Sequence, residues 1–126
     1  MNNYLLDTHA LLWVFDDNPT ISSNAREAMN QADIIYASLV SVWEIVIKKA
    51  LGKLEVTDDL EQAIIKTGVR QLPITLAHIL AVGDLPLEQH KDPFDRLLVA
   101  QAKVEGLTLI TRDVHLGNYG VPIIAA

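Results

Sequence analysis

The sequence predicts an α/β domain in which a parallel β-sheet is covered by helices on both faces. Short apolar runs alternate along the chain with longer segments whose apolar residues recur at helical spacing. That alternation is typical of parallel strands joined by helical crossovers. The length of 126 residues suits one domain, and 50% hydrophobic against 21% charged residues indicates a folded core. We therefore expect a single domain over residues 1–126.

The first half of the chain predicts two strands, each followed by helices. The turn residues up to Pro19 end the first helix, and Ser22 is suited to cap the second. Gly52 and Gly68 stand where two later helices should stop. The expected strands are 4–6 and 34–37, and the expected helices are 10–15, 22–32, 41–51 and 58–66.

The second half contains the clearest helix of the sequence. Asp92 is placed to cap it, Pro93 suits its first position, and Gly106 follows its last residue. Earlier, Pro73 removes a hydrogen-bond donor and restricts its strand to a strand end or a sheet edge. The expected strands are 69–74, 107–111 and 121–124, the expected helices are 75–82 and 93–105, and residues 83–91 should form a loop.

Composition excludes several classes of protein. The absence of cysteine excludes a disulfide framework, a thiolate zinc site and a cysteine nucleophile, and it fits a reducing, cytoplasmic location. The longest apolar run, residues 10–15, is too short to span a membrane, so we expect a soluble protein. A net charge of −6 argues against a basic surface that coats nucleic acid, yet it allows an enzyme that handles nucleic acid through metal ions.

Several carboxylates stand where parallel strands end. Asp7 follows the first strand, Glu44 lies early in the helix after the second, and Asp113 follows the strand at 107–111. Ligands of such sheets bind at the carboxyl ends of the strands, so these three acids should share one edge. Asp92 and Asp95 join them if the helix that they open starts at the same edge.

Each acid also has a purely structural interpretation. Ser41 and Glu44 have the spacing of a capping box, and Asp92 is suited to cap a helix. Asp95 would lie in the first turn of that helix, where the helix dipole stabilises a negative charge. Asp7 could cap a helix, and Asp113 could brace a turn. These alternatives remain open for each residue taken alone.

Taken together, the acids favour a metal site. Asp7 ends an apolar strand where a capping serine would serve as well. Several carboxylates close together repel one another unless a cation is present. Oxygen ligands without cysteine suit Mg²⁺ or Mn²⁺ rather than zinc. Thr8 and Thr111 could donate hydrogen bonds to ligand carboxylates, or be ordinary threonines beside strand ends. The residues that bind substrate stay unknown from the sequence.

Four segments resemble the motifs of PIN-domain proteins, in the same order along the chain. The acid-bearing segments are 5–13 (LLDTHALLW), 41–54 (SVWEIVIKKALGKL), 92–102 (DPFDRLLVAQA) and 109–113 (LITRD). A PIN domain of this length without added segments resembles the VapC-type toxins of toxin–antitoxin pairs.

The resemblance implies a three-layer α/β/α sandwich on a parallel sheet of about five strands. It also implies a Mg²⁺- or Mn²⁺-dependent endoribonuclease. Asp7, Glu44 and Asp95 carry over as the core acids and Asp113 as the fourth, with Asp92 as an additional acid. The implied partners are an RNA substrate, a VapB-like antitoxin that inserts a segment near the site, and a second copy of the chain in a homodimer.

Two other functions stay open at this point. The domain could bind RNA or a protein without cutting, although all four motif acids are present. The same site could also serve a metal-dependent phosphatase or a DNA nuclease. The RNA target and the number of metal ions are not set by the sequence.

Overall fold

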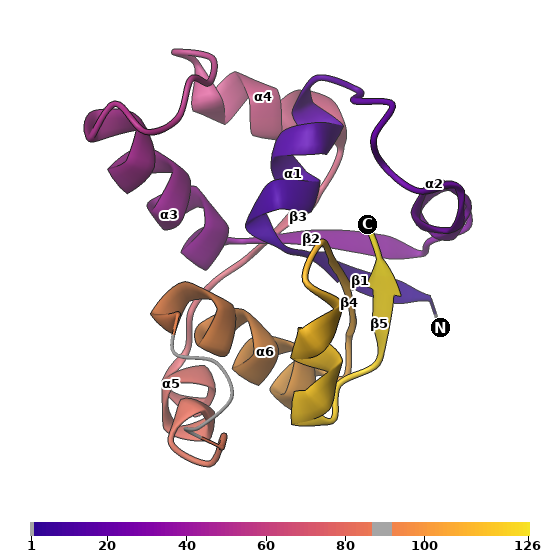
Figure 1. The fold of residues 1–126 in the computed structure, drawn as a ribbon, viewed down its shortest axis with the longest axis vertical. Helices are drawn as coiled ribbons and strands as arrows, with labels where there is room; N and C mark the ends of the chain where they lie inside the picture. The colour runs from indigo at the N-terminus through magenta and orange to yellow at the C-terminus, as the bar shows by residue number, and fades with distance from the viewer. Residues whose placement is uncertain (1, 87–91) are drawn as a thin grey trace.

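The computed structural model describes residues 2–86 and 92–126. Its centre is one parallel sheet of five strands in the order β3-β2-β1-β4-β5 (Figure 1). The predicted parallel sheet is therefore confirmed, with β1 in the middle. The strands are β1 (Asn3–Leu6), β2 (Ile34–Ser38), β3 (Arg70–Leu72), β4 (Thr108–Thr111) and β5 (Ile123–Ala125).

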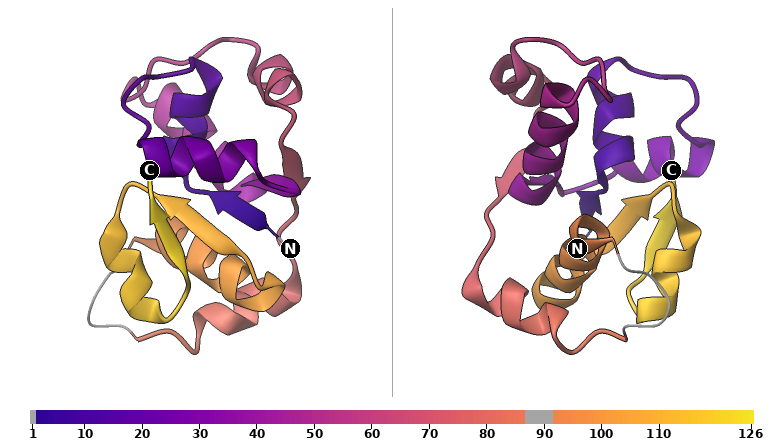
Figure 2. Two further views of the ribbon diagram at one scale, coloured as in Figure 1. Left: turned by 90° about the vertical axis from the view of Figure 1, so that its right-hand side faces the viewer. Right: turned by 60° about the vertical axis from the view of Figure 1, so that its left-hand side comes forward.

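Helices cover both faces of this sheet and complete the three layers. The upper helices in Figure 1 are α1 (Thr8–Phe15), α2 (Ser23–Asn30), α3 (Leu39–Ala50) and α4 (Leu60–Thr67). The lower ones are α5 (Leu76–Val82), α6 (Pro93–Glu105) and the 3₁₀ helix η1 (Val114–Tyr119). The two further views keep the same separation (Figure 2). No helix in residues 2–86 and 92–126 is long and apolar enough to cross a membrane.

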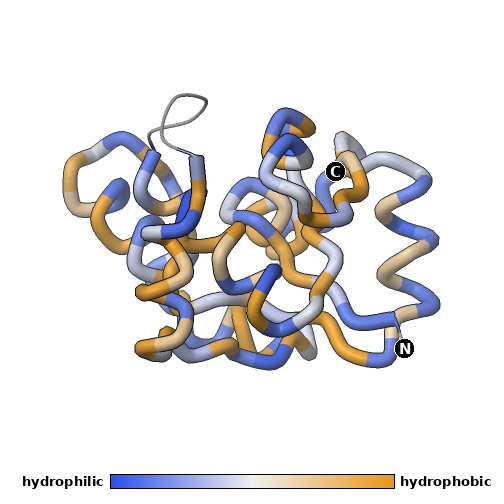
Figure 3. Tube along the Cα trace, turned by 90° about the horizontal axis from the view of Figure 1, so that it is seen from below, coloured by the Kyte–Doolittle hydropathy of each residue, from blue (hydrophilic) through white to orange (hydrophobic). Residues whose placement is uncertain are grey.

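Two hydrophobic cores lie between these layers. Successive strand residues point to opposite faces. Leu5 of β1 therefore belongs to the core shared with Leu98 of α6, whereas Leu6 belongs to the core shared with Leu11 of α1. All four side chains are fully buried. The helices alternate hydrophobic and hydrophilic residues along their turns, as this arrangement requires (Figure 3).

Some boundaries differ from the prediction. Helix α3 begins two residues early, because the Ser38 hydroxyl accepts from the Val40 amide at 3.0 Å and is the true N-cap. The last strand is shifted toward the end of the chain, since Pro122 has no amide to donate and pairing with β4 starts at Ile123. The sequence did not predict η1. The predicted loop is a turn over residues 83–86, and residues 87–91 lie outside the described part.

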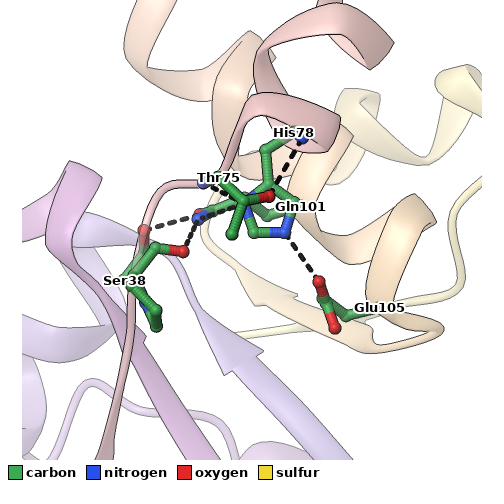
Figure 4. A network of polar contacts seen from close by, with 6 residues as sticks. Ser38, Thr75, His78, Gln101 and Glu105 are labelled. Atoms are coloured by element: carbon green, nitrogen blue, oxygen red, sulfur yellow. Dashed lines mark hydrogen bonds and ion pairs between the residues drawn. The ribbon is translucent and has the colours of Figure 1, made fainter.

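A polar network centred on the buried side chains of Ser38, His78 and Gln101 joins the start of α3 to α5 and α6 (Figure 4). The Ser38 hydroxyl donates to Gln101 Oε1 at 2.5 Å, and the Gln101 amide lies 3.3 Å from His78 Nδ1. The Thr75 amide also donates to Nδ1, at 3.1 Å. On the other side of the ring, His78 Nε2 lies 2.7 Å from Glu105. This closed network fixes the start of α3 against α6 and α5.

Candidate active site

The topology of the sheet places a crevice at the carboxyl ends of β1 and β4. These strands are neighbours, but β1 continues to β2 on one side and β4 continues to β5 on the other. The connection after β1 runs through α1 and α2, while that after β4 runs through η1 on the opposite face. Parallel sheets bind ligands where two such connections diverge. Asp7 directly follows β1 and Asp113 follows β4 at this point.

Asp7 is held rigidly by neutral donors. Its Oδ1 accepts from the Ala10 amide at 2.7 Å, so it caps α1 as one interpretation of the sequence proposed. Its Oδ2 accepts from the Thr111 hydroxyl at 2.7 Å and from the Arg112 amide at 2.9 Å. The residue is only 5% exposed. Capping of α1 does not exclude a role in a site, because the cap uses only Oδ1 and the donors to Oδ2 lie just before Asp113 in the sequence.

Thr111 connects the acids that follow the two central strands. Besides donating to Asp7, its hydroxyl accepts from the Asp113 amide at 2.9 Å. The Asp113 carboxylate in turn accepts from the His115 amide at 3.0 Å and caps η1. The predicted turn-bracing interaction of Asp113 is thus present, and the Thr111 side chain orients Asp7.

Glu44 does not form the capping box that its spacing suggested. Because Ser38 caps α3, Glu44 lies beyond the first turn, and the capping-box interpretation is wrong. Its carboxylate accepts from the Thr8 hydroxyl at 2.6 Å and from Lys48 Nζ at 2.6 Å. The Ser41 hydroxyl lies 3.1 Å from that of Thr8. The buried side chain of Glu44 is therefore fixed between α1 and its own helix.

The first turn of α6 brings two more acids to this edge. Asp92 is the N-cap, accepting from the amides of Phe94 at 2.9 Å and Asp95 at 3.4 Å. The Phe94 ring meets Trp43 of α3 edge-on, with 5.0 Å between the ring centroids. Helix α6 therefore starts beside α3, which fulfils the condition for Asp92 and Asp95 to join the other acids.

A pocket of about 360 Å³ unites three of the predicted acids. Asp7, Asp95 and Asp113 line it together with His9 and Arg112. Neither Glu44 nor Asp92 is among the lining residues. The structure therefore brings three aspartates from distant parts of the sequence to one cavity, with Glu44 and Asp92 outside it.

Lys48 lies among the remaining acids. The hydrogen bond to Glu44 raises the pKa of Lys48 above its ordinary value of 10.5, against the lowering by burial. The charges of Glu44, Asp92 and Asp95 raise it further. The Lys48 ammonium is thus electrostatically coupled to acids of both α3 and α6.

The donor chemistry of the pocket fits a magnesium or manganese ion. Three carboxylates and no sulfur line it, which suits hard cations. Within residues 2–86 and 92–126, no three acidic or histidine side chains stand close enough to enclose an ion by themselves. Mg²⁺ does not need such a cage, because it keeps several waters and takes one or two protein carboxylates. The residues present therefore fit such an ion.

Comparison with known proteins settles the family. The family model of the PIN domain matches residues 4–121. The chain belongs to the PIN domain family. A curated relative is Ribonuclease VapC22 of Mycobacterium tuberculosis (strain ATCC 25618 / H37Rv), 28% identical over 129 residues that cover 97% of this chain and 95% of that protein.

Solved structures share the fold of this PIN domain. VapBC2 from Rickettsia felis, bound to a DNA fragment from its promoter, matches with a TM-score of 0.74 and 18% identity over 97% of both chains. DNA-bound VapBC from Salmonella typhimurium gives 0.72 and 16% over 98% of both. FitAcB from Neisseria gonorrhoeae gives 0.69 and 18% over 97% of this chain and 96% of that one. At such identities these matches bear on the fold alone.

Sequence reasoning missed two features of the PIN-domain site. One is the ion pair of Glu44 with Lys48, although the spacing of four residues on a helix was a readable signal. The other is the backbone amide of Arg112, which donates to Asp7. No sequence signal could have found it, because any residue other than proline offers that amide.

Proposed function

We propose that this PIN domain is a metal-dependent endoribonuclease and the toxin of a VapBC-type toxin–antitoxin pair. The observation that carries the proposal is the pocket at the sheet's carboxyl edge, which Asp7, Asp95 and Asp113 line together. The name of the relative VapC22 supports RNA as the substrate. PIN-domain ribonucleases in general depend on divalent metal ions.

The proposed roles follow from the contacts of each acid. Asp7, Asp95 and Asp113 would hold Mg²⁺ or Mn²⁺, which when bound activates water and offsets phosphate charge. Thr111 and the Arg112 amide orient Asp7. The Asp92 cap fixes the helical turn that carries Asp95.

Glu44 is the fourth acid of the proposed site. Thr8 holds its carboxylate at the edge of the site, where it could bind an ion directly, act through water, or orient a neighbouring group. The structure favours the last of these roles, because Glu44 is paired with Lys48 and does not line the pocket. Asp92 serves here as a cap that supports the site.

The proposed protein partner is a VapB-like antitoxin. Two of the solved structures with this fold, from Rickettsia felis and Salmonella typhimurium, are of VapBC bound to DNA, which supports such a partner. A groove of about 850 Å³ runs between α1 and α4 and is lined by apolar residues such as Trp13 and Val56. His9 lines both this groove and the acidic pocket. A segment lying in the groove would therefore reach the proposed active site, as the sequence resemblance implied.

A second copy of the chain is the other proposed partner. Exposed apolar side chains on α3 and α5, among them Trp43, Val46, Ile79 and Leu80, offer a surface for it. Sedimentation of the purified chain and of a Leu80→Glu variant would test this. A dimer that the substitution dissociates is the expected result, and a wild type that sediments as a monomer would contradict it.

The alternatives predict different substrates. A silent binding module would bind RNA without cutting it, and a phosphatase or a DNA nuclease would cut other phosphate esters. The preservation of all motif acids and the rigid hold on Asp7 favour an active enzyme. Parallel assays with single-stranded RNA, duplex DNA and a small phosphate ester would separate these possibilities.

The decisive experiment compares two substitutions of the same kind. Asp7 and Asp59 are both helix N-caps, and asparagine caps a helix as well as aspartate. We expect Asp7→Asn to lower Mg²⁺-dependent RNA cleavage by more than ~100-fold, beyond what losing a hydrogen-bond partner of a ligand costs. Titration calorimetry should show weaker Mn²⁺ binding in the same variant.

Asp59→Asn is the control for this experiment. Asp59→Asn should cleave like the wild type, since Asp59 does not line the acidic pocket. Chelation with EDTA should stop cleavage by both active proteins. If Asp7→Asn cleaves at the wild-type rate while folded, the metal assignment is wrong.

A further inference from the structure

We propose that Lys48 contacts a phosphate of the bound RNA strand and that Glu44 acts in the reaction by positioning Lys48. This inference rests on the proposed ribonuclease function. It departs from the family-based expectation that Glu44 is a metal ligand. The two residues lie one helical turn apart on α3, with 2.6 Å between Lys48 Nζ and Glu44 Oε2.

The first argument is the difference between Glu44 and Asp7. Both are buried carboxylates that accept a threonine hydroxyl, at 2.6 Å from Thr8 and at 2.7 Å from Thr111. The other donors to Asp7 are the neutral amides of Ala10 and Arg112, so within the described residues no hydrogen-bonding cation cancels its negative charge. Glu44 instead faces an ammonium group, which cancels its charge and repels a second cation. Asp7 is therefore suited to hold a metal ion, and Glu44 to hold Lys48.

The second argument is the exposure of the pair. The Glu44 side chain is 7% exposed, whereas that of Lys48 is 40% exposed. The other carboxylate oxygen of Glu44, Oε1, accepts a hydrogen bond from the Thr8 hydroxyl. The carboxylate thus acts as a buried anchor, and the lysine is left accessible from solvent at the edge of the site.

The third argument is electrostatic. Asp92 and Asp95 act on Lys48 through their charges, so the lysine stands near the acids that open α6. The carboxylates of this edge repel the phosphates of RNA. A lysine held there supplies a compact positive charge, which is the way in which lysine binds phosphate.

The adjacent residue provides a matched control. Lys49 forms an ion pair with Asp58 at 3.0 Å, but Asp58 is fully exposed and does not line the acidic pocket. Lys49→Met removes the same charge from the same helix as Lys48→Met. The two variants therefore separate a local contact from a general loss of positive charge.

The first test measures RNA binding without metal. A fluorescein-labelled oligouridylate is titrated with each protein in EDTA over a range of salt concentrations. Each phosphate contact contributes about 0.7 to the slope of log K against log salt for a single strand. We expect Lys48→Met to lower the slope by about that amount, and Lys49→Met to leave it unchanged. Equal slopes for wild type and Lys48→Met would overturn the proposal.

The second test uses a double-mutant cycle on cleavage and Mn²⁺ binding. If Glu44 works through Lys48, Glu44→Gln and Lys48→Met should each lower kcat/KM by about 10-fold or more, and the double variant should be no worse than the poorer single one. Calorimetry should show Mn²⁺ binding retained in Glu44→Gln. Loss of Mn²⁺ binding in that variant would instead make Glu44 a metal ligand, and multiplied losses in the double variant would show that the two residues act independently; either result would overturn the proposal.

Two further comparisons separate the possible failures. Lys48→Arg keeps the charge and the ion pair, so it should recover part of the activity lost in Lys48→Met even if methionine destabilises the buried Glu44. If wild type cleaves and Asp7→Asn does not, but Lys48→Met cleaves normally, the inference about Lys48 fails while the proposed function stands. If wild type cleaves no RNA, the proposed function fails and the inference falls with it.

Discussion

Two polar regions of this molecule, each containing buried side chains, use their hydrogen bonds in opposite ways. In the network of Figure 4, donors and acceptors are matched. The Thr75 amide donates to His78 Nδ1, so Nε2 carries the ring proton and donates to Glu105. Gln101 uses its oxygen for Ser38 and its amide for His78 and the Pro73 carbonyl. Such a closed set of hydrogen bonds positions helices.

The acidic edge is arranged differently. Asp7 receives donors on both oxygens, yet three carboxylates still line one pocket, and His9 and Arg112 complete that lining. Carboxylates gathered in this way repel one another, and a bound cation would relieve that repulsion. The comparison teaches that burial and hydrogen bonding do not distinguish a structural cluster from a functional one. Several carboxylates that line one cavity are the feature that supports a functional site at the acidic edge.

The largest effect should be a loss of stability when Gln101 is removed from the network of Figure 4. Gln101→Leu keeps the approximate size of the side chain but removes a hydrogen-bond partner from Ser38, His78 and the Pro73 carbonyl, of which His78 keeps the Thr75 amide. Buried groups left unpaired cost about 1–3 kcal/mol, so we expect the free energy of unfolding to fall by about 2–3 kcal/mol. Urea unfolding measures it, with the exposed Gln62→Leu as control. The folded variant should cleave RNA within about 2-fold of wild type, since it touches no pocket residue.

The next effect tests the acidic edge through Thr111. Thr111→Val preserves the shape of the side chain but removes the hydroxyl that donates to Asp7. Losing a hydrogen-bond partner of a metal ligand typically costs 10–100-fold, and we expect a loss of about 10-fold in kcat/KM. Thr108→Val, in the same strand, should behave as wild type. If both variants cleave equally well, the Asp7–Thr111 contact has no part in catalysis.

A smaller effect distinguishes the two serines near the start of α3. Ser38→Ala removes the N-cap and the donor to Gln101, so stability should fall by about 1 kcal/mol or more. Ser41→Ala should cost less, since Ser41 does not cap the helix. Thermal unfolding of the two variants measures the difference. A larger loss for Ser41→Ala would restore the capping box that the sequence suggested.

The smallest effect concerns alkaline pH. The pKa of Lys48 is raised by its hydrogen bond to Glu44. The folded state therefore holds this proton more tightly than the unfolded chain, and the stabilisation is complete below pH 10.5 and lost as pH rises through the raised pKa. The pair is partly exposed, so the loss should be about a few tenths of a kcal/mol. Urea unfolding at alkaline pH should show this loss in wild type and not in Lys48→Met.

Much of this architecture could be predicted from local patterns. Helix α6 has the predicted bounds because Asp92, Pro93 and Gly106 act within one or two residues of its ends. The apolar runs located the strands in the sequence, and therefore also the acids that follow the strand ends. The start of α3 was predicted wrongly because Ser38 and Ser41 are both suitable caps, and the choice depends on Gln101, 63 residues away. Contacts over such distances leave no local signal in the sequence.

The same limit applies to the site. Asp7, Asp95 and Asp113 could be nominated from the sequence, but their sharing of one pocket depends on where α6 begins relative to the sheet. The pairing of Glu44 with Lys48 rather than with Ser41 followed from the early start of α3. One displaced cap thus changed the interpretation of an acid in the next turn.

The pairing of β4 beside β1 has a consequence for synthesis on the ribosome. The Asp7 carboxylate is synthesised about a hundred residues before its partners, Thr111 and the Arg112 amide. A growing chain that lacks β4 cannot assemble the acidic edge, whatever its first strands and helices do. The domain therefore acquires its proposed cutting site only after β4 has been synthesised, and a growing chain that lacks β4 presents no such site to the surrounding RNA.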